Sequence, residues 1–217
     1  PPRAHALLAN LLLCPRRRPR ERLVGLLFPD VSERSGRRRL SDLLWLLRDS
    51  LPGLPLDTAS DWIEIPAPSR WLDVEAFRDT AVGEDLAAWQ DALALYGGDL
   101  LPGCYDDWLL VEREALHLEY LRLLFQSAEN LFHLGRFREA LPLAEMVLQE
   151  EPLEERAVRL TMRLHAGLGQ RGAALAAFER FVGTAADELA VEPAPATEAL
   201  ARAIRSSMPA PPSTSDA

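Results

Sequence analysis

The first fifty residues contain three short segments in which leucines recur at the spacing of one helix face. These segments are residues 3–14, 20–28 and 35–51. Pro15 ends the first segment, and Pro19 opens the second at a first-turn position, where a missing N–H breaks no helical hydrogen bond. Three short helices with tight connections are typical of a helix-turn-helix core.

A pattern typical of strands follows the third of these helices. Residues 54–57 and 62–65 are rich in apolar residues and flank the short polar sequence T-A-S. This arrangement predicts two short strands joined as a β-hairpin. A hairpin directly after three helices would form the wing of a winged helix.

From residue 73 onward the apolar pattern is helical. Asp73 is expected to cap a helix that starts at residues 73–77, and a second helix covers residues 84–96. Two glycines and a Pro-Gly turn then separate this part of the chain from a long helix at residues 107–134. A last helix is expected at residues 196–206, where it would cap the open end of the helical stack.

The C-terminal part contains an internal repeat with a period of 34 residues. Gly135 recurs as Gly169, and Ala140 recurs as Ala174. This period is the signature of tetratricopeptide repeats, in which each helix pair buries its apolar face by stacking on the next pair. The glycines are expected to turn one helix into the next, and the alanines are expected where two helices approach closely.

Charge is distributed unevenly along the chain. Residues 1–50 carry 11 arginines against 5 acidic residues, whereas residues 51–217 carry 13 arginines against 28 acidic residues. The net charge is −9, and the sequence contains no lysine. A basic N-terminal quarter on an acidic chain indicates an anionic partner at one end only.

Two motifs, one near the middle of the chain and one in its last quarter, resemble those of a known family. The run L-Y-G-G-D-L-L-P-G at residues 95–103, with D-W at 107–108 and E-R at 112–113, resembles the start of the bacterial transcriptional activator domain. The run that begins F-E-R-F and ends E-L-A-V-E-P, at residues 178–193, resembles its end. The chain as a whole is similar to SARP-like regulators, in which a winged helix precedes this helical-repeat module.

The resemblance implies a mainly α fold with three parts. Residues 1–71 would form a winged helix-turn-helix DNA-binding domain with a small β-hairpin wing. Residues 72–206 would form the activator domain with tetratricopeptide-like helices, and residues 207–217 a disordered tail or linker. In this family a small sheet precedes the first helix. The chain begins at or inside that helix, so we expect a truncated winged helix without the N-terminal sheet.

The candidate DNA contacts come from the third helix and from the arginines before the second helix. They are Arg16, Arg17, Arg18, Arg37, Arg38, Arg39, Ser41, Trp45 and Arg48. With the leucines of the third helix facing inward, its polar side and its N-terminal arginines would meet base edges in a major groove. The three arginines before the second helix would bind backbone phosphates, which positions the protein without reading sequence.

Acidic residues in the same region oppose this hypothesis. Asp42 and Asp49 share the outward side of the third helix, and Asp57, Asp61 and Glu64 lie in the expected wing. Carboxylates are repelled by a phosphate backbone. The alternative is a winged helix that no longer binds DNA, whose arginines form a solvated charged face. It would then serve as a protein-docking or autoinhibitory module of a larger signalling ATPase.

Under the first hypothesis the protein is a bacterial transcriptional activator. The resemblance implies binding to direct repeats in double-stranded promoter DNA and contact with RNA polymerase. The repeat domain would dimerise the protein. It would either also recruit partners through a peptide groove, or contain only enough repeats to form its own core and to dimerise. A C-terminal ATPase domain follows such a module in some longer relatives.

The sequence offers no catalytic site, metal site or cofactor site, so we do not expect an enzyme. The four histidines lack partners at ligand spacing, and no phosphate-binding loop occurs. Cys14 and Cys104 are expected to be free thiols in a reducing compartment. No segment approaches the ~20 apolar residues that span a bilayer. We therefore expect a cytoplasmic, nucleoid-associated protein.

Overall fold

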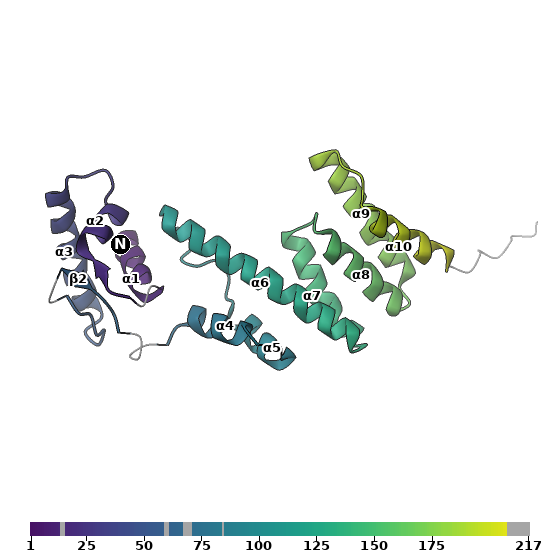
Figure 1. Ribbon diagram of the computed structural model, residues 1–217, viewed down its shortest axis with the longest axis horizontal. Coiled ribbons are helices and arrows are strands. Elements are labelled where there is room, and N and C mark those ends of the chain that lie inside the picture. Colours follow the sequence, from purple (N-terminus) through teal and green to yellow (C-terminus); the bar gives the residue numbers. More distant parts are fainter. Residues whose placement is uncertain (14–15, 59–60, 67–70, 84, 208–217) are drawn as a thin grey trace, which may run out of the picture. The chain divides into compact units, whose positions relative to one another are not determined.

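The structure of the chain is a computed structural model (Figure 1). It describes residues 1–13, 16–58, 61–66, 71–83 and 85–207. The chain forms two compact units, Pro1–Glu119 and Tyr120–Ala217. Cys14 and nearly all of the expected tail at residues 207–217 lie outside the described residues. Both units are helical, and the first also contains a small antiparallel sheet.

Three helices form the N-terminal part of the first unit, as the leucine spacing predicts. They are α1 (Pro2–Leu13), α2 (Arg20–Leu27) and α3 (Glu33–Ser50). Leu7, Leu23 and Leu40, one from each helix, are fully buried in a single hydrophobic cluster. Two details of the third helix differ from the prediction. Ser32 is the N-cap, so α3 starts earlier than residue 35, and Leu51, predicted to face inward, is the C-cap and is exposed.

The sheet of the first unit has two short strands. β2 (Trp62–Ile63) pairs in antiparallel register with β1 (Arg18–Pro19), the segment just before α2. The backbone N–H of Arg20 also donates to the carbonyl of Asp61 at 2.9 Å. Ile63 is fully buried in the same cluster as the three helices. The linker between α1 and α2 therefore supplies a strand that the sequence pattern did not predict.

The expected hairpin is present only as one isolated bridge. In this bridge Asp57 and Glu64 exchange both backbone hydrogen bonds, at 3.0 and 3.2 Å. The same register would place Pro55 opposite Pro66, and neither proline has an N–H to donate. The ladder therefore cannot continue beyond Asp57 and Glu64 in that direction, and the longer pairing of β2 is with β1.

α2 packs against α3 at Gly36, where a side chain has no room. A Cβ on Gly36 would lie 2.4 Å from Cγ1 of Val24, whose branched side chain has little rotamer freedom. We expect Gly36→Ala to lower the free energy of unfolding by about 1–3 kcal/mol through overpacking. This exceeds the gain of up to ~1 kcal/mol that alanine has over glycine within a helix. Urea unfolding followed by circular dichroism measures the change.

Gly25→Ala is the matched control for this prediction. Gly25 lies in α2, and a Cβ there would meet no atom within 4 Å. Alanine should leave the stability unchanged or raise it by up to ~1 kcal/mol. A similar gain from both substitutions would contradict the close contact between α2 and α3.

Three further helices follow, and their order agrees with the sequence pattern. They are α4 (Asp73–Ala81), α5 (Leu86–Leu95) and α6 (Asp107–His133). The prediction of Asp73 as the cap of α4 is wrong by one residue, because Leu72 occupies the N-cap position. Asp73 is the first residue of the helix, and its Oδ1 accepts a hydrogen bond from the backbone N–H of Val74 at 2.8 Å.

Arg78 ties α4 to the first half of α6. Its Nη1 lies 2.8 Å from Oε1 of Glu112, and its Nε lies 3.2 Å from Oε2 of Glu119. Partial burial disfavours the charge of Arg78, but hydrogen bonds and attraction from the two carboxylates outweigh this and raise its pKa above the ordinary value. Arg78 therefore stays charged, and the carboxylate of Glu112 is already paired.

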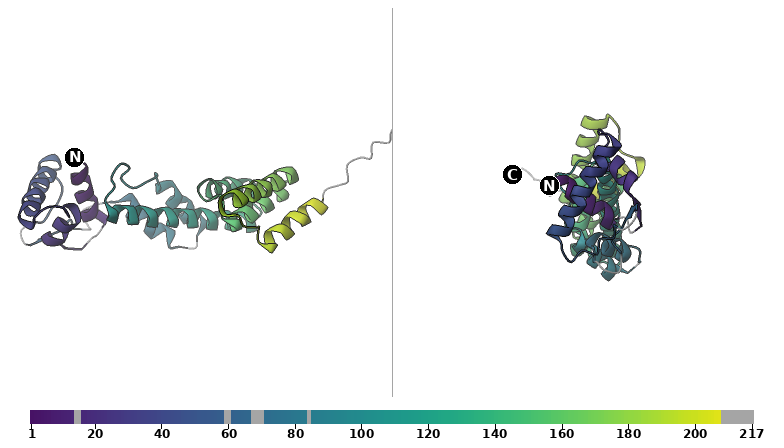
Figure 2. Two further views of the ribbon diagram at one scale, coloured as in Figure 1. Left: turned by 90° about the horizontal axis from the view of Figure 1, so that it is seen from above. Right: turned by 90° about the vertical axis from the view of Figure 1, so that its left-hand side faces the viewer.

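The second unit contains the predicted helix repeats. These helices are α7 (Phe137–Glu150), α8 (Glu155–Gly167) and α9 (Arg171–Leu189). α7 packs against α8 and α8 against α9, and the helices lie side by side in Figures 1 and 2. Gly135 and Gly169 have φ angles of 73° and 76°, which favour glycine and confirm the two predicted turns. Ala140 and Ala174 are fully buried, as expected at close helix contacts.

The last helix, α10 (Pro195–Ser206), packs against α8 and α9. Glu155 of α8 fixes its start. The Glu155 carboxylate accepts hydrogen bonds from the backbone N–H of Ala194, at 3.0 Å, and from the Thr197 hydroxyl. That hydroxyl also accepts a hydrogen bond from Nη1 of Arg159 at 3.0 Å. The mainly α fold with a small sheet and tetratricopeptide-like repeats is thus confirmed.

Candidate nucleic-acid interface

α3 presents a continuous row of polar and aromatic side chains to solvent. We define the α3 stripe as Arg34, Arg38, Ser41, Trp45 and Arg48. Successive members are four or three residues apart, the spacing that keeps side chains on one helix face. All five are exposed, whereas the buried leucines of α3 belong to the hydrophobic cluster of the unit. The stripe is therefore available to a partner.

Arg34 and Arg38 are the most accessible charges of the stripe. Neither has an ion pair or hydrogen bond within the described part of the chain. Arg37, one position away, pairs with Glu33 across one helical turn at 2.7 Å. Both partners are exposed, and such pairs contribute only about 0–1 kcal/mol. Arg37 can therefore exchange Glu33 for a phosphate at little cost.

Arg34 was not among the residues predicted from the sequence. The pattern placed the start of the third helix at residue 35, which left Arg34 in the preceding loop. In the structure Ser32 is the N-cap and Glu33 is the acidic residue of the first turn. A serine followed by an acid is a helix-start signal, so this signal could have brought Arg34 into the stripe.

Ser41 and Arg39 have local partners. The hydroxyl of Ser41 donates to the backbone carbonyl of Arg37 at 3.0 Å, and the side chain remains exposed. The guanidinium of Arg39 lies 5.9 Å from the ring centroid of Phe28, which also carries Arg3 at 5.2 Å. This cation–π contact holds Arg39 away from the stripe.

Arg48 connects α3 to the segment that was expected to form the wing, residues 54–58 and 61–65, which we call the wing segment. Its Nη2 donates to the carbonyl of Leu56 at 3.4 Å and to the hydroxyl of Thr58. Arg20 reaches the same segment, because its Nη2 donates to the carbonyl of Thr58 at 3.2 Å. Each of these contacts is made to a carbonyl or hydroxyl oxygen of that segment.

The arginines before α2 differ from one another. Arg16 and Arg17 are exposed, and Nε of Arg17 lies 3.2 Å from Oε2 of Glu64. Arg18 is only half-exposed, and its buried Nε has no hydrogen-bond partner among the described residues. Arg18 is therefore less accessible to a partner than Arg16 and Arg17 are.

Acidic side chains border the α3 stripe, as the sequence indicates. Asp42 and Asp49 are exposed on α3. In the wing, however, the Glu64 carboxylate faces Arg17, so one of the expected repulsive charges is neutralised. Asp57 and Asp61 of the wing are also exposed, so the remaining surface combines the exposed arginines of α3 with four aspartates.

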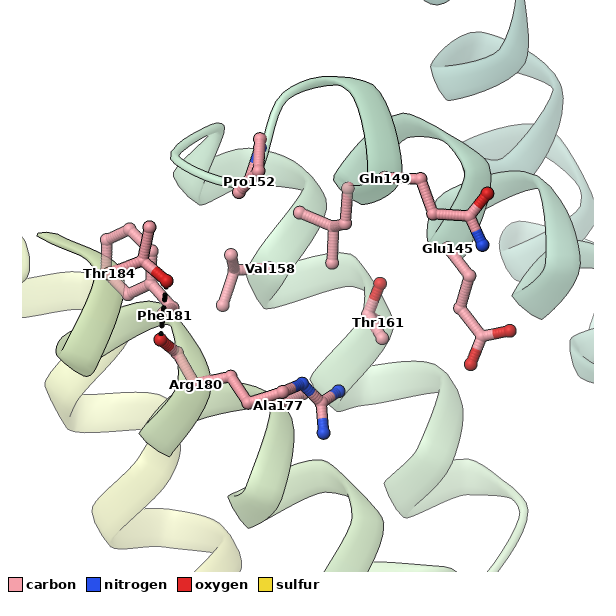
Figure 3. Close-up of a pocket in the computed structure, with 10 residues that line it drawn as sticks. Glu145, Gln149, Pro152, Val158, Thr161, Ala177, Arg180, Phe181 and Thr184 are labelled. Carbon is pink, nitrogen blue, oxygen red and sulfur yellow. Dashed lines mark hydrogen bonds between the residues drawn. The ribbon is translucent and has the colours of Figure 1, made fainter. Parts of the chain in front are cut away.

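A second candidate site lies in the repeat unit. Residues of α7, α8 and α9 line a cavity of about 350 Å³ (Figure 3). In Figure 3 the Arg180 side chain extends from α9 toward α8, and Glu145 approaches from α7. Thr161 of α8 is 1% exposed, and its Oγ1 has no partner in the described part of the chain. The cavity thus joins apolar walls, an unpaired hydroxyl and charged edges.

The described residues contain no cluster of three or more His, Cys, Asp or Glu side chains that could hold a metal ion. Cys104 is a buried free thiol. Within the same residues, no helix combines the length and the apolar character that a membrane crossing requires.

Comparison with known proteins identifies a family and a structural relative. Residues 73–205 match the bacterial transcriptional activator domain. No curated protein matches the chain. The fold is similar to that of Mycobacterium tuberculosis EmbR, solved in complex with a low affinity phosphopeptide. The TM-score is 0.76 and the identity 21%, over 96% of this chain and 60% of the EmbR chain. The chain thus spans about three fifths of the EmbR chain.

The family match covers more than half of the chain and includes both motifs that carried the resemblance. This domain is characteristic of SARP-type transcriptional regulators. The chain belongs to the bacterial transcriptional activator domain family.

Proposed function

We propose that this chain binds duplex DNA by placing the α3 stripe in the major groove. The observation that carries this proposal is the pair Arg34 and Arg38, which lie one turn apart, are exposed and have no partner within the described residues. A major groove admits an α-helix, and arginine there can pair with guanine or bind the backbone. Ser41 and Trp45, further along the stripe, offer a hydroxyl and an aromatic ring to the same groove.

Arg16, Arg17 and Arg37 are proposed as phosphate contacts beside the groove. The ion pairs of Arg17 and Arg37 are exposed, so a phosphate can replace the carboxylate partner. Arg18 and Arg39 contribute less to this surface, because Nε of Arg18 is buried and Arg39 packs over Phe28.

The salt dependence of duplex binding tests this proposal. If four arginines each neutralise one phosphate, affinity should fall about a hundredfold between about 50 and 200 mM salt. Fluorescence anisotropy with a labelled random-sequence duplex and with promoter fragments at both salt concentrations measures this. Absence of binding to every duplex at low salt would contradict the proposal.

We propose that the chain acts within a transcriptional activator that binds direct repeats in promoter DNA. The cavity between α7, α8 and α9 supports partner recruitment, because it offers an unpaired hydroxyl at Thr161 and a charged edge at Arg180. An extended segment of a partner protein, such as RNA polymerase, would bind there through backbone and side-chain hydrogen bonds. The family membership of the chain favours this role.

We further propose a homodimer that uses an exposed apolar face of α6. Val111 and Leu118 lie seven residues apart on one face of this helix and are 72% and 53% exposed. Burial of two such side chains contributes about 3 kcal/mol or more. Replacing both residues with serine should weaken dimerisation about a hundredfold or more.

Sedimentation equilibrium over a wide range of concentrations measures this effect. Leu134→Ser is the matched control, since Leu134 is also exposed, at 60%, but lies beyond the end of α6. A dimer that survives the Val111 and Leu118 substitutions, or a wild-type chain that remains monomeric throughout, would exclude this interface.

A docking role is the second candidate. It is favoured by Asp42 and Asp49 on α3 and by the contacts of Arg48 with the wing segment. In that case the winged helix binds a protein or another part of a longer parent chain, such as a C-terminal ATPase domain. The duplex titration separates the two candidates, because a docking module shows no salt-dependent affinity for DNA.

A further inference from the structure

A polar cavity of about 220 Å³ lies apart from the α3 stripe, in the first unit. Residues of α1, β1, α2 and the first turns of α6 line it. The polar side chains among them are Asn10, Arg18, Arg22, Trp108 and Glu112. Trp108 also packs against the hydrophobic cluster of the three N-terminal helices. Segments far apart in the sequence therefore meet around this cavity.

Three buried polar atoms around the cavity have no hydrogen-bond partner among the described residues. They are Oδ1 of Asn10, Nε of Arg18 and Nε1 of Trp108. Asn10 as a whole is 5% exposed. A buried polar atom without a partner has lost its hydration and gained nothing in return, so such atoms are rare in folded proteins. Their gathering at one cavity indicates that something polar belongs there.

The charges around the cavity favour the binding of an anion. Arg18 and Arg22 bring two guanidinium groups, and Trp108 adds a neutral N–H donor. Glu112 is the acidic side chain in the lining, and its Oε1 is already held by Nη1 of Arg78 at 2.8 Å. The site therefore has an excess of positive charge and of donors.

Asn10 fits the same ligand in either orientation of its amide. Its oxygen can accept a hydrogen bond from a protonated phosphate oxygen, and after an amide flip its NH₂ group can donate to an oxyanion. The cavity is far larger than the roughly 10–15 Å³ that one water needs and smaller than the roughly 300–1,000 Å³ of drug-sized ligand sites. Its size suits a small anion or the anionic end of a metabolite.

We propose that this cavity binds a small oxyanion, a phosphate or carboxylate group, through Arg18, Arg22, Trp108 and Asn10. An oxyanion accepts hydrogen bonds from both arginines and the indole at once, which satisfies the unpaired donors. Arg18 belongs to β1, which pairs with β2, so the bound anion links the small sheet to α6. The site does not depend on DNA binding by α3.

Nuclear magnetic resonance of the full chain tests this site without DNA. The chain has five tryptophans, and the indole N–H signal of Trp108 is the one that disappears in Trp108→Phe. Titration with inorganic phosphate should shift this signal, whereas sodium chloride at equal ionic strength should not. A parallel titration with acetate distinguishes a phosphate site from a carboxylate site.

Arg18→Gln should lower the affinity for the bound anion at least tenfold, measured on the same Trp108 signal. Arg163→Gln is the matched control, since it removes the same charge from an exposed position on α8 and should leave the affinity unchanged. A rise in the melting temperature with phosphate, seen in the wild type and reduced in Trp108→Phe, provides a second measurement. No shift with either anion, an equal shift with sodium chloride, or an unchanged affinity in Arg18→Gln would overturn the proposal.

Discussion

Replacing both Arg34 and Arg38 with glutamine is expected to weaken binding to duplex DNA about a hundredfold. Both side chains are exposed on the α3 stripe, and neither has a partner within the described residues. Each arginine that contacts guanine or phosphate contributes about 1–3 kcal/mol, and each lost phosphate contact lowers the salt slope by about one unit. The double variant should therefore also flatten the log-log salt dependence by up to about two units.

Fluorescence anisotropy over a range of salt concentrations measures both quantities in one experiment. Arg163→Gln is again the control, because it changes the net charge on α8 and lies outside the stripe. Circular dichroism should show that the double variant is folded, since neither side chain packs in the core. An affinity unchanged from the wild type would remove α3 from the interface.

Leu40→Ala is expected to lower the free energy of unfolding of the first unit by about 2–5 kcal/mol. Leu40 is fully buried and belongs to the cluster that joins α1, α2, α3 and the sheet. Truncation leaves a cavity that the helices can fill only in part, because interiors are close-packed. Since α3 carries the stripe, the variant should also lose DNA binding at temperatures where this unit unfolds.

Urea unfolding of wild type and variant gives the difference in free energy. Leu51→Ala is the control, because Leu51 is the C-cap of the same helix and is 41% exposed. Leu51→Ala should lower the free energy of unfolding by well under half as much as Leu40→Ala. Equal effects at the two positions would show that the leucine cluster does not hold the winged-helix part together.

Most of the helices could be predicted because helical spacing is a local signal. The leucines of α1, α2 and α3 recur on one face, and the glycines before α7 and α9 sit at positive φ as their sequence positions predict. The family could also be identified, since both of its motifs lie within the matched segment.

The sheet could not be predicted in full, because its strands are only two residues long and carry no period. Arg18 and Pro19 stand between two helices and gave no strand signal, yet they pair with β2. Pro55 and Pro66, which the bridge register would place opposite each other, explain why the pairing does not extend beyond Asp57 and Glu64 on that side. Their effect depends on a register that the sequence does not state.

A helical wheel also cannot predict which groups the arginine side chains contact. The wheel places Arg48 outward, and it is exposed, but its length lets it reach the wing at Leu56 and Thr58. The sequence predicts that Arg18 contacts phosphate as Arg16 and Arg17 do, whereas its Nε lies buried beside a cavity. That cavity is lined by residues about a hundred positions apart in the chain, so no local sequence pattern could predict it.

Trp45 provides the most direct test of the central claim that the α3 stripe contacts DNA. It belongs to the stripe and is 67% exposed, whereas Trp89 of α5 is 9% exposed and serves as an internal reference. On addition of a duplex at low salt, the indole N–H signal of Trp45 should shift or broaden while that of Trp89 stays unchanged. A duplex that binds without changing the Trp45 signal, or that does not bind at all, would contradict the account.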